Sequence, residues 1–214
     1  MSQGPRPLYD GGMYHIIARG NNRLAIFSLE GAHEFFLSRC LKQAKEKFPG
    51  WKLFHWCAMS NHLHFLTQML KGAVMPKLMQ FVLLKFSLWY KRQTNYVGHV
   101  WQRPYKSLPI EDERYFLECG RYIELNPVRA RIVSDPKAYP WSSYGYYAFG
   151  KKDPVIDADP YYASLGKDPL TRQRNYRELV KIERPYDKLL DNALFEKRAR
   201  KGGALKGWES VREM

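Results

Sequence analysis

The chain has 214 residues, of which 45% are hydrophobic and 15% aromatic, so it can form one domain with a buried core, alone or with an extension. No stretch approaches the roughly 18 consecutive apolar residues of a membrane-spanning helix, and the first residues lack the apolar segment of a secretion signal. Cys40, Cys57 and Cys119 form no CxxC pair, which argues against a zinc cluster and a disulfide framework. These features exclude a transmembrane protein and favour a reduced, cytoplasmic setting.

The charge is strongly basic, with 35 Lys and Arg against 21 Asp and Glu. No acidic residue lies between Glu46 and Glu111, a stretch that we call the acid-free stretch. Charge of one sign suits a polyanion, although a solvated surface or attraction to anionic lipid is an alternative. We rank nucleic acid first because aromatic residues, which can stack on unpaired bases or pack in the core, interleave with the cations: Trp89, Tyr90, Tyr96, Trp101 and Tyr105.

Strand and helix signals alternate from the N-terminus. Residues 13–19 resemble a strand and are followed by a Gly-Asn-Asn-Arg turn signal. Apolar residues at three- and four-residue steps predict an amphipathic helix over 31–48. Two strands are predicted next, over 51–59 and 62–69, and their two-residue separation indicates a hairpin.

The pattern continues with a helix over 74–94 and a short strand over 105–110. A third helix should begin with acidic residues in its first turn, where they favour the positive end of the helix dipole. It should end near Asn126, because Pro127 disfavours helical geometry in the residue before it.

This order predicts an α+β fold of the ferredoxin-like, split βαβ type, with an antiparallel sheet and helices on one face. The other face is expected to stay open for a ligand, and the third helix is an addition to the basic pattern. Residues 1–150 should form the main domain, and 151–171, rich in Gly, Pro and Asp, a linker. Residues 172–214 should be a basic extension that is helical to about residue 200.

Two histidines provide the sharpest local motif. His62 and His64 are two residues apart on a predicted strand, so they point to the same face, roughly 7 Å apart, and can share a metal ion. The bare pattern is common, and two half-exposed sheet histidines are the alternative. His15 and His55 are further candidates, each favoured as a structural histidine.

Tyr122 and Asn126 are four residues apart on the third predicted helix, on one face with Cys119 and Tyr115. Tyr122 is either a packed aromatic residue or a nucleophile, and Asn126 is either a ligand or a helix end. A phenol with a pKa of about 10 is a weak nucleophile at neutral pH, so it would need a metal ion to polarise a phosphate.

Five sequence blocks occur in a characteristic order: YHIIARGNN (14–22), WCAMSNHLHFL (56–66), GHVWQRPYKS (98–107), RYIELNPVRARIV (121–133) and YPWSSY (139–144). Over about residues 13–147, the chain resembles the REP-associated tyrosine transposases, a domesticated branch of the small HUH insertion-sequence transposases. The basic C-terminal part is only loosely similar to the tails of this group.

This resemblance implies a single-strand DNA endonuclease and strand transferase that binds hairpins and cuts beside them, with 1–150 as its catalytic domain. His62 and His64 match the metal ligands, Tyr122 matches the nucleophile, and Asn126 stands where relatives place a third, polar ligand. Ser60 replaces the proline most often found there, which should alter the hairpin turn but not the ligands.

The resemblance further implies Mg²⁺ or Mn²⁺ on this set and a 5′-phosphotyrosine intermediate with a free 3′-hydroxyl. Imidazole ligands would also accept zinc or nickel. The expected partner is single-stranded or hairpin DNA related to repetitive extragenic palindromes, in a nucleoid-associated protein that is a monomer or a homodimer. Four basic residues are either phosphate contacts or ordinary surface charges: Arg19, Lys106, Arg121 and Arg129.

Two other functions compete with this interpretation. A non-catalytic single-strand nucleic-acid binder would retain the fold and basic surface, but would have no reason to keep His62, His64, Tyr122 and Asn126. A histidine-triad phosphohydrolase would need another alternating histidine where this chain has Leu66.

Overall fold

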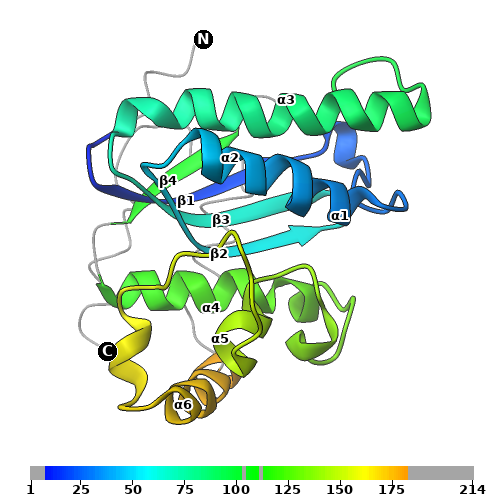
Figure 1. Ribbon diagram of the computed structural model, residues 1–214. Coiled ribbons are helices and arrows are strands. Elements are labelled where there is room, and N and C mark those ends of the chain that lie inside the picture. The colour runs from blue at the N-terminus through cyan, green and yellow to red at the C-terminus, as the bar shows by residue number, and fades with distance from the viewer. Residues whose placement is uncertain (1–7, 103–104, 111–112, 183–214) are drawn as a thin grey trace, which may run out of the picture. The chain divides into compact units, whose positions relative to one another are not determined.

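The computed structural model describes residues 8–102, 105–110 and 113–182. Its centre is a four-stranded antiparallel sheet with strand order β2-β3-β1-β4 (Figure 1). The strands are β1 (Gly12–Arg19), β2 (Trp51–Met59), β3 (His62–Met69) and β4 (Lys106–Ile110). The predicted α+β fold with an antiparallel sheet is confirmed. Among the described residues, no helix has the length and apolar character that crossing a membrane would require.

Strand register divides the side chains between the two faces of the sheet. β1 and β3 pair with Arg19 opposite His62 and Ile17 opposite His64. Because successive side chains alternate between faces, His15, Ile17, His62 and His64 share one face. The even-numbered residues of β1 and the odd-numbered residues of β3 face the opposite way.

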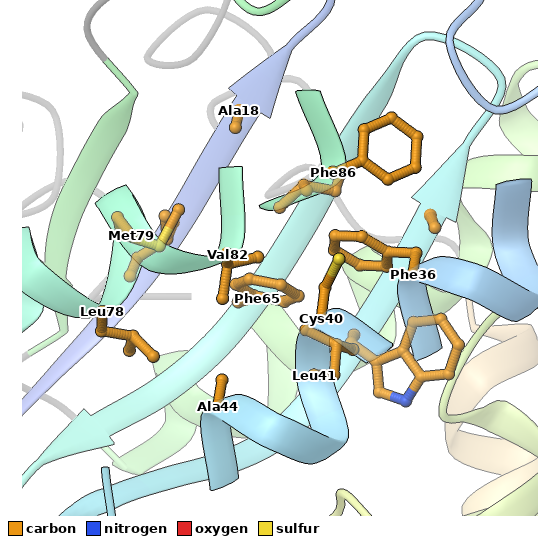
Figure 2. Packing of buried hydrophobic residues seen from close by; sticks show 14 of the residues in the cluster. Ala18, Phe36, Cys40, Leu41, Ala44, Phe65, Leu78, Met79, Val82 and Phe86 are labelled. Carbon is orange, nitrogen blue, oxygen red and sulfur yellow. The ribbon is translucent and has the colours of Figure 1, made fainter. Parts of the chain in front are cut away.

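That opposite face carries the main apolar core. A helical run covers it, made of α1 (Ala32–Phe35), the π-helical turn η2 (Phe36–Leu41) and α2 (Lys42–Lys47), and α3 (Met75–Thr94) lies beside this run (Figure 1). Figure 2 shows Phe65 of β3 among Phe36, Leu41 and Val82 from these helices. The helix predicted over 31–48 is therefore present, with a π-helical turn at its middle.

The face with the histidines is not open, which corrects the prediction. Helix α4 (Glu113–Arg129) contacts β2 and β3, on the side of the sheet away from α3 (Figure 1). An apolar stripe that includes Phe116, Cys119 and Ile123 is buried. The Phe116 ring packs against Phe54 of β2 with 5.3 Å between ring centroids. Burial of this stripe drives α4 onto the sheet, because exposed apolar surface is costly in water.

Helix α4 also continues through Pro127 to Arg129, so the predicted end near Asn126 is wrong. Proline lacks the N–H that would bond to the carbonyl of Ile123 four residues earlier. The Asn126 side chain compensates for this loss, because its Nδ2 donates to the Ile123 carbonyl at 3.4 Å and to the Tyr122 carbonyl at 2.9 Å.

Residues 151–171 are packed, although the sequence predicted a linker. Asp157 N donates to the Leu53 carbonyl of β2 at 2.8 Å, and Asp157 also pairs with Lys45 and Lys52. The helices α5 (Tyr144–Phe149) and α6 (Pro169–Lys181) share a small core of their own. The compact unit ends at Lys181 instead of near residue 150. Residues 183–200 of the predicted extension helix lie outside the described residues.

Short helical turns complete the fold: η1 (Asn21–Arg23), η3 (Gly72–Val74), η4 (Pro136–Ala138) and η5 (Tyr162–Leu165). The turn predicted after β1 is present, with Asn22 and Arg23 at φ of 49° and 61°. Gly20 N donates to the Asn61 carbonyl at 2.7 Å, so this turn lies against the β2–β3 hairpin turn.

Candidate active site

Three histidines meet where β1 and β3 pair. The ring centroids of His62 and His64 are 4.9 Å apart, and those of His15 and His64 are 5.2 Å apart. His15 and His64 are fully buried, whereas His62 keeps 9% of its surface exposed. The spacing-based prediction that His62 and His64 share a face agrees with this arrangement, and His15 joins them from the neighbouring strand.

Each of the two predicted ligands has a hydrogen bond on its Nδ1 atom. His64 Nδ1 lies 3.0 Å from His15 Nε2, and His62 Nδ1 lies 2.6 Å from Asn61 Oδ1. The buried His64 Nε2 atom has no hydrogen-bond partner among the described residues. A buried nitrogen without a partner is costly, so this atom is suited to a ligand.

Helix α4 brings Tyr122 against this histidine group. Its ring meets the rings of His15 and His64 edge-on, with 6.0 Å between centroids in each case. The Arg129 guanidinium lies over the Tyr122 ring, 4.8 Å from its centroid. Tyr122 is 0% exposed, so a DNA strand can reach its hydroxyl only if α4 or the covering side chains move.

Asn126 follows Tyr122 one turn later on α4 and is buried. Its Nδ2 donates to the helix backbone, which leaves Oδ1 as the amide atom that a metal ion can take. Within the part of the chain that the structure describes, no group of three or more His, Cys, Asp or Glu could hold a metal ion. A three-ligand metal site would therefore need a ligand of another type, and the Asn126 amide is the one that the sequence predicts.

The histidines of the site are held neutral. Burial lowers the pKa of His15 to about 3, and burial together with the charge of Arg19 lowers that of His62 to about 4. Burial also holds the pKa of His64 well below its usual value, assisted by His62, His15, Arg19 and Arg129. Neutral imidazole is the metal-binding form, and the nearby arginines favour an anion such as phosphate.

The four predicted phosphate contacts differ in position. Lys106 and Arg129 are exposed, and Arg19 is partly exposed at the end of β1. Burial and the charge of Arg19 lower the pKa of Lys106, which indicates that these two cations are neighbours. Arg121 is 0% exposed, and its Nε donates to Glu118 Oε2 at 2.9 Å. Arg121 is thus a buried helix cation, and the prediction that it contacts phosphate does not agree with its position.

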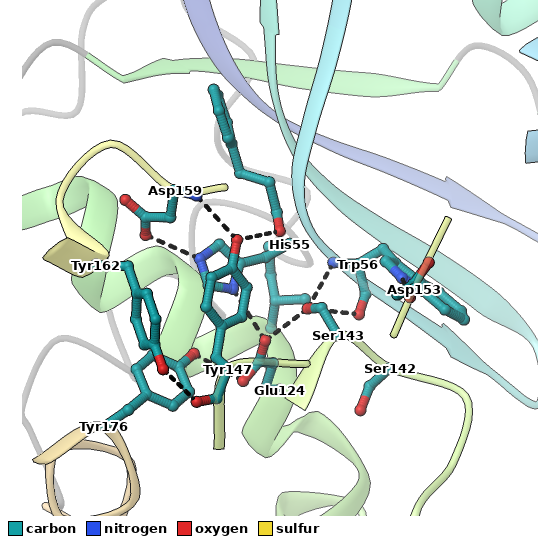
Figure 3. A network of polar contacts seen from close by, with 12 residues as sticks. His55, Trp56, Glu124, Ser142, Ser143, Tyr147, Asp153, Asp159, Tyr162 and Tyr176 are labelled. Carbon is teal, nitrogen blue, oxygen red and sulfur yellow. Dashed lines mark hydrogen bonds and ion pairs between the residues drawn. The ribbon is translucent and has the colours of Figure 1, made fainter. Parts of the chain in front are cut away.

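A second buried polar cluster surrounds His55 of β2 and contains side chains of α4, α5 and α6 (Figure 3). His55 Nδ1 bonds to Glu124 Oε1 at 2.9 Å, and His55 Nε2 bonds to Asp159 Oδ2 at 3.0 Å. Burial alone would lower the pKa of His55, but the hydrogen bonds and charges of Asp159 and Glu124 outweigh it and raise the pKa to about 9. His55 is therefore a charged structural residue, in contrast to the neutral histidines of the site.

Glu124 connects this cluster to the surrounding helices (Figure 3). Ser143 Oγ donates to Glu124 Oε1 at 2.5 Å, and the Tyr176 hydroxyl of α6 donates to Glu124 Oε2 at 2.7 Å. The Tyr147 ring of α5 stacks on His55 with 4.3 Å between centroids. Sequence reasoning missed the partners of His55, because no spacing rule links residues 69 and 104 positions apart. The cluster anchors the helix that carries Tyr122 and Asn126.

The chain is similar to known transposases in fold and in sequence. A solved REP-associated tyrosine transposase bound to a REP hairpin is similar in fold, with a TM-score of 0.58 and 17% identity, covering 74% of this chain and 93% of that chain. A putative transposase from Deinococcus radiodurans R1 has a TM-score of 0.39 and 20% identity, covering 58% of this chain and 96% of that chain. No curated protein matches the sequence.

The family described as "Transposase IS200 like" matches residues 9–126. The matched region is more than half of the chain and contains all four strands, both histidines of the β3 motif, Tyr122 and Asn126. The chain therefore belongs to the IS200-like transposases, a family of DNA-processing enzymes.

Proposed function

We propose that this protein is a metal-dependent single-strand DNA endonuclease and strand transferase that acts at hairpins through a 5′-phosphotyrosine intermediate. The observation that carries the proposal is the contact of the Tyr122 ring with the rings of His15 and His64. It brings a potential nucleophile and potential metal ligands into one site. The related transposase bound to a REP hairpin supports hairpin DNA as the partner of this chain as well.

The residues present fit a divalent metal ion. The buried His64 Nε2 has no partner among the described residues, and the imidazoles of His62 and His64 are neutral, as ligation requires. With Asn126 Oδ1 they make a mixed nitrogen and oxygen set that suits Mg²⁺ or Mn²⁺, while zinc and nickel would also bind imidazole. Such an ion would supply Lewis-acid polarisation of the scissile phosphate.

Side chains of this protein would carry out the nucleophilic attack and stabilise the charge on the phosphate. The Tyr122 hydroxyl loses its proton to solvent and its oxygen forms a new bond to phosphorus, while the bond from phosphorus to the 3′ oxygen breaks in line. The released 3′ oxygen takes a proton from solvent and leaves as the free 3′-hydroxyl. Arg19 and Arg129, whose charges act on His64, balance the charge that develops on the phosphate. Attack by another 3′-hydroxyl on the phosphotyrosine reverses the step and joins strands.

A non-catalytic, single-strand binding protein is the second candidate. The complete burial of Tyr122 favours it, since a buried hydroxyl meets no substrate without movement. The two functions differ in one measurable product, the covalent adduct between protein and DNA.

Removal of the metal or of a ligand should separate cutting from binding. With labelled hairpins from sequence flanking the gene and added Mn²⁺, a chelator or His62→Ala is expected to abolish cleavage. Hairpin affinity should stay within about threefold, because contacts of Lys and Arg to phosphate supply most of the binding free energy. Gel analysis measures cleavage and fluorescence anisotropy measures binding. His33→Ala, at a half-buried histidine outside the site, is the control, and equal loss of both activities in His62→Ala would indicate a structural role.

The exposed cations near the site should set the salt dependence of binding. Lys106→Gln and Arg129→Gln are each expected to reduce the slope of log affinity against log salt by about 1, for every hairpin sequence alike. Lys77→Gln, an exposed change on α3 beyond the opposite face of the sheet, should leave the slope unchanged. A slope that changes in Lys77→Gln but not in Lys106→Gln or Arg129→Gln would mean that DNA binds on the α3 side of the sheet, away from the histidines.

A further inference from the structure

We propose that Asn61 and His15 are positioning residues that hold His62 and His64 in the Nδ1–H tautomer, so that both Nε2 atoms present lone pairs to one divalent cation. This inference rests on the proposed function, because it assigns what prepares the two imidazoles for the metal. It concerns two residues that neither ligate nor react.

The hydrogen bond from His62 to Asn61 determines the first tautomer. Asn61 Oδ1 is an acceptor only, so the proton of the 2.6 Å contact belongs to His62 Nδ1. A neutral imidazole carries one proton, and the lone pair is therefore on Nε2. The backbone carbonyl of Asn61 accepts a separate hydrogen bond from Gly20 N at 2.7 Å, which anchors this turn residue to the loop after β1.

The contact between His64 Nδ1 and His15 Nε2 allows two proton positions. If His15 donates, the proton of His64 lies on its buried Nε2. If His64 donates, the unpaired buried N–H is His15 Nδ1 instead; neither of these two atoms has a partner among the described residues.

The ligand role proposed for His64 distinguishes the two arrangements. A lone pair on the buried His64 Nε2 can be taken by a metal ion, whereas an N–H at that atom would stay without an acceptor among the described residues. His64 is thus the donor and His15 the acceptor, with the His15 ring oriented by the edge-on Tyr122 ring.

As a consequence, the His62 and His64 rings are already oriented for ligation before a metal ion binds. Hydrogen bonds from the second nitrogen of a ligand histidine fix its ring and its tautomer, and their loss commonly weakens metal binding about 10–100-fold. Here the two acceptors are of different kinds: an amide in the hairpin turn and a second imidazole on β1.

The direct test is spectroscopic and needs no metal. Long-range proton–nitrogen correlation spectra of the ¹⁵N-labelled, metal-free full chain report which ring nitrogen of each histidine is protonated. We expect Nδ1–H for both His62 and His64. Nε2–H on either ring would overturn the proposal for that ring, whether or not the protein cuts DNA.

Variants then connect tautomer to metal affinity, measured by titration with Mn²⁺ followed by electron paramagnetic resonance. Asn61→Ala is expected to weaken Mn²⁺ binding about 10–100-fold and to mix the tautomers of His62. The φ angle of Asn61 is not positive, so alanine at this position adds no backbone strain. Asn61→Asp, which keeps the acceptor oxygen, and Ser60→Ala, in the same turn, should stay within about threefold of the wild type.

On β1, His15→Phe keeps a ring beside Tyr122 but removes the hydrogen-bond acceptor of His64 Nδ1. It should weaken Mn²⁺ binding as much as Asn61→Ala does. His15→Gln retains an acceptor and should recover part of the lost affinity. If the buried His15 variants fail to fold, the result for Asn61→Ala tests the proposal. Unchanged affinity and unchanged tautomers in Asn61→Ala would overturn the proposal. Correct tautomers without any DNA adduct would instead contradict the proposed function.

Discussion

Tyr122→Phe is expected to abolish strand cleavage and the covalent protein–DNA adduct while leaving the fold and hairpin binding nearly intact. Only one oxygen is removed, and phenylalanine retains the ring that packs against His15, His64 and Arg129. If Tyr122 were only a packed aromatic residue, the loss would be at most a hydrogen bond worth about 0.5–1.5 kcal/mol of stability. Denaturing gel electrophoresis of a labelled hairpin reaction measures the adduct.

Tyr115→Phe is the matched control. Tyr115 is also buried on α4, and burial, Cys119 and Tyr122 raise the pKa of its phenol, so it is a poor nucleophile. Seven residues along a helix separate it from Tyr122 by about 10 Å. We expect normal cleavage by Tyr115→Phe. If that variant were the inactive one, the nucleophile would be misassigned. Normal cleavage by both variants would contradict the tyrosine mechanism itself.

Glu124→Gln is expected to destabilise the protein by about 1.5–3 kcal/mol, because it replaces the charged hydrogen bonds of a buried carboxylate by those of a neutral amide, while Asp159 still pairs with His55. Glu124 is fully buried, and its two oxygens accept hydrogen bonds from His55, Ser143 and Tyr176. Urea denaturation of the two proteins at pH 7 measures the difference. Glu178→Gln removes an ion pair with Lys181 in which both side chains are at least 66% exposed, and it should cost less than about 1 kcal/mol. Similar losses in the two variants would contradict the special role of the buried cluster.

The same cluster predicts how stability depends on pH. The pKa of His55 is raised from 6.5 to about 9, so the folded state binds the proton more tightly than the unfolded state. The stabilisation is fully present below about pH 6.5 and is lost as pH rises through about 9. The groups that face the ring are Glu124, Asp159, Tyr147 and Tyr176.

The stability difference between the wild type and His55→Gln, measured from pH 6 to pH 10, isolates this contribution from other titrations. It should be largest at pH 6 and should shrink steadily above pH 6.5. A difference that stays constant across this range would mean that His55 is neutral in the folded protein.

Local periodicity was sufficient for the strands and for the internal geometry of the motifs. Alternation along β3 predicted that His62 and His64 share a face, and the four-residue helical step predicted that Tyr122 and Asn126 do. The ordered sequence blocks predicted the family, and the match to IS200-like transposases confirms it. Each of these features depends on neighbouring residues or on the order of motifs along the chain, so it can be predicted from the sequence.

Contacts between distant segments could not be predicted in this way. The sequence does not specify which face α4 covers, because the same apolar stripe can pack on either side of a sheet. Helix α4 passes Pro127 because the Asn126 side chain donates to the carbonyl left without a partner. Arg121 is basic in sequence but buried by the packing of α4.

The tertiary structure alone decided which of the four histidines is charged. His55 contacts two carboxylates from residues 69 and 104 positions away and is charged. Burial keeps His15, His62 and His64 neutral, and nearby arginines add to this effect at His62 and His64. The physical reason is that the protonation of an imidazole depends on desolvation and on nearby charges, and both are properties of the folded surroundings. Sequence by itself determined the strands, the motifs and the family. The fold determined which of His15, His55, His62 and His64 is charged.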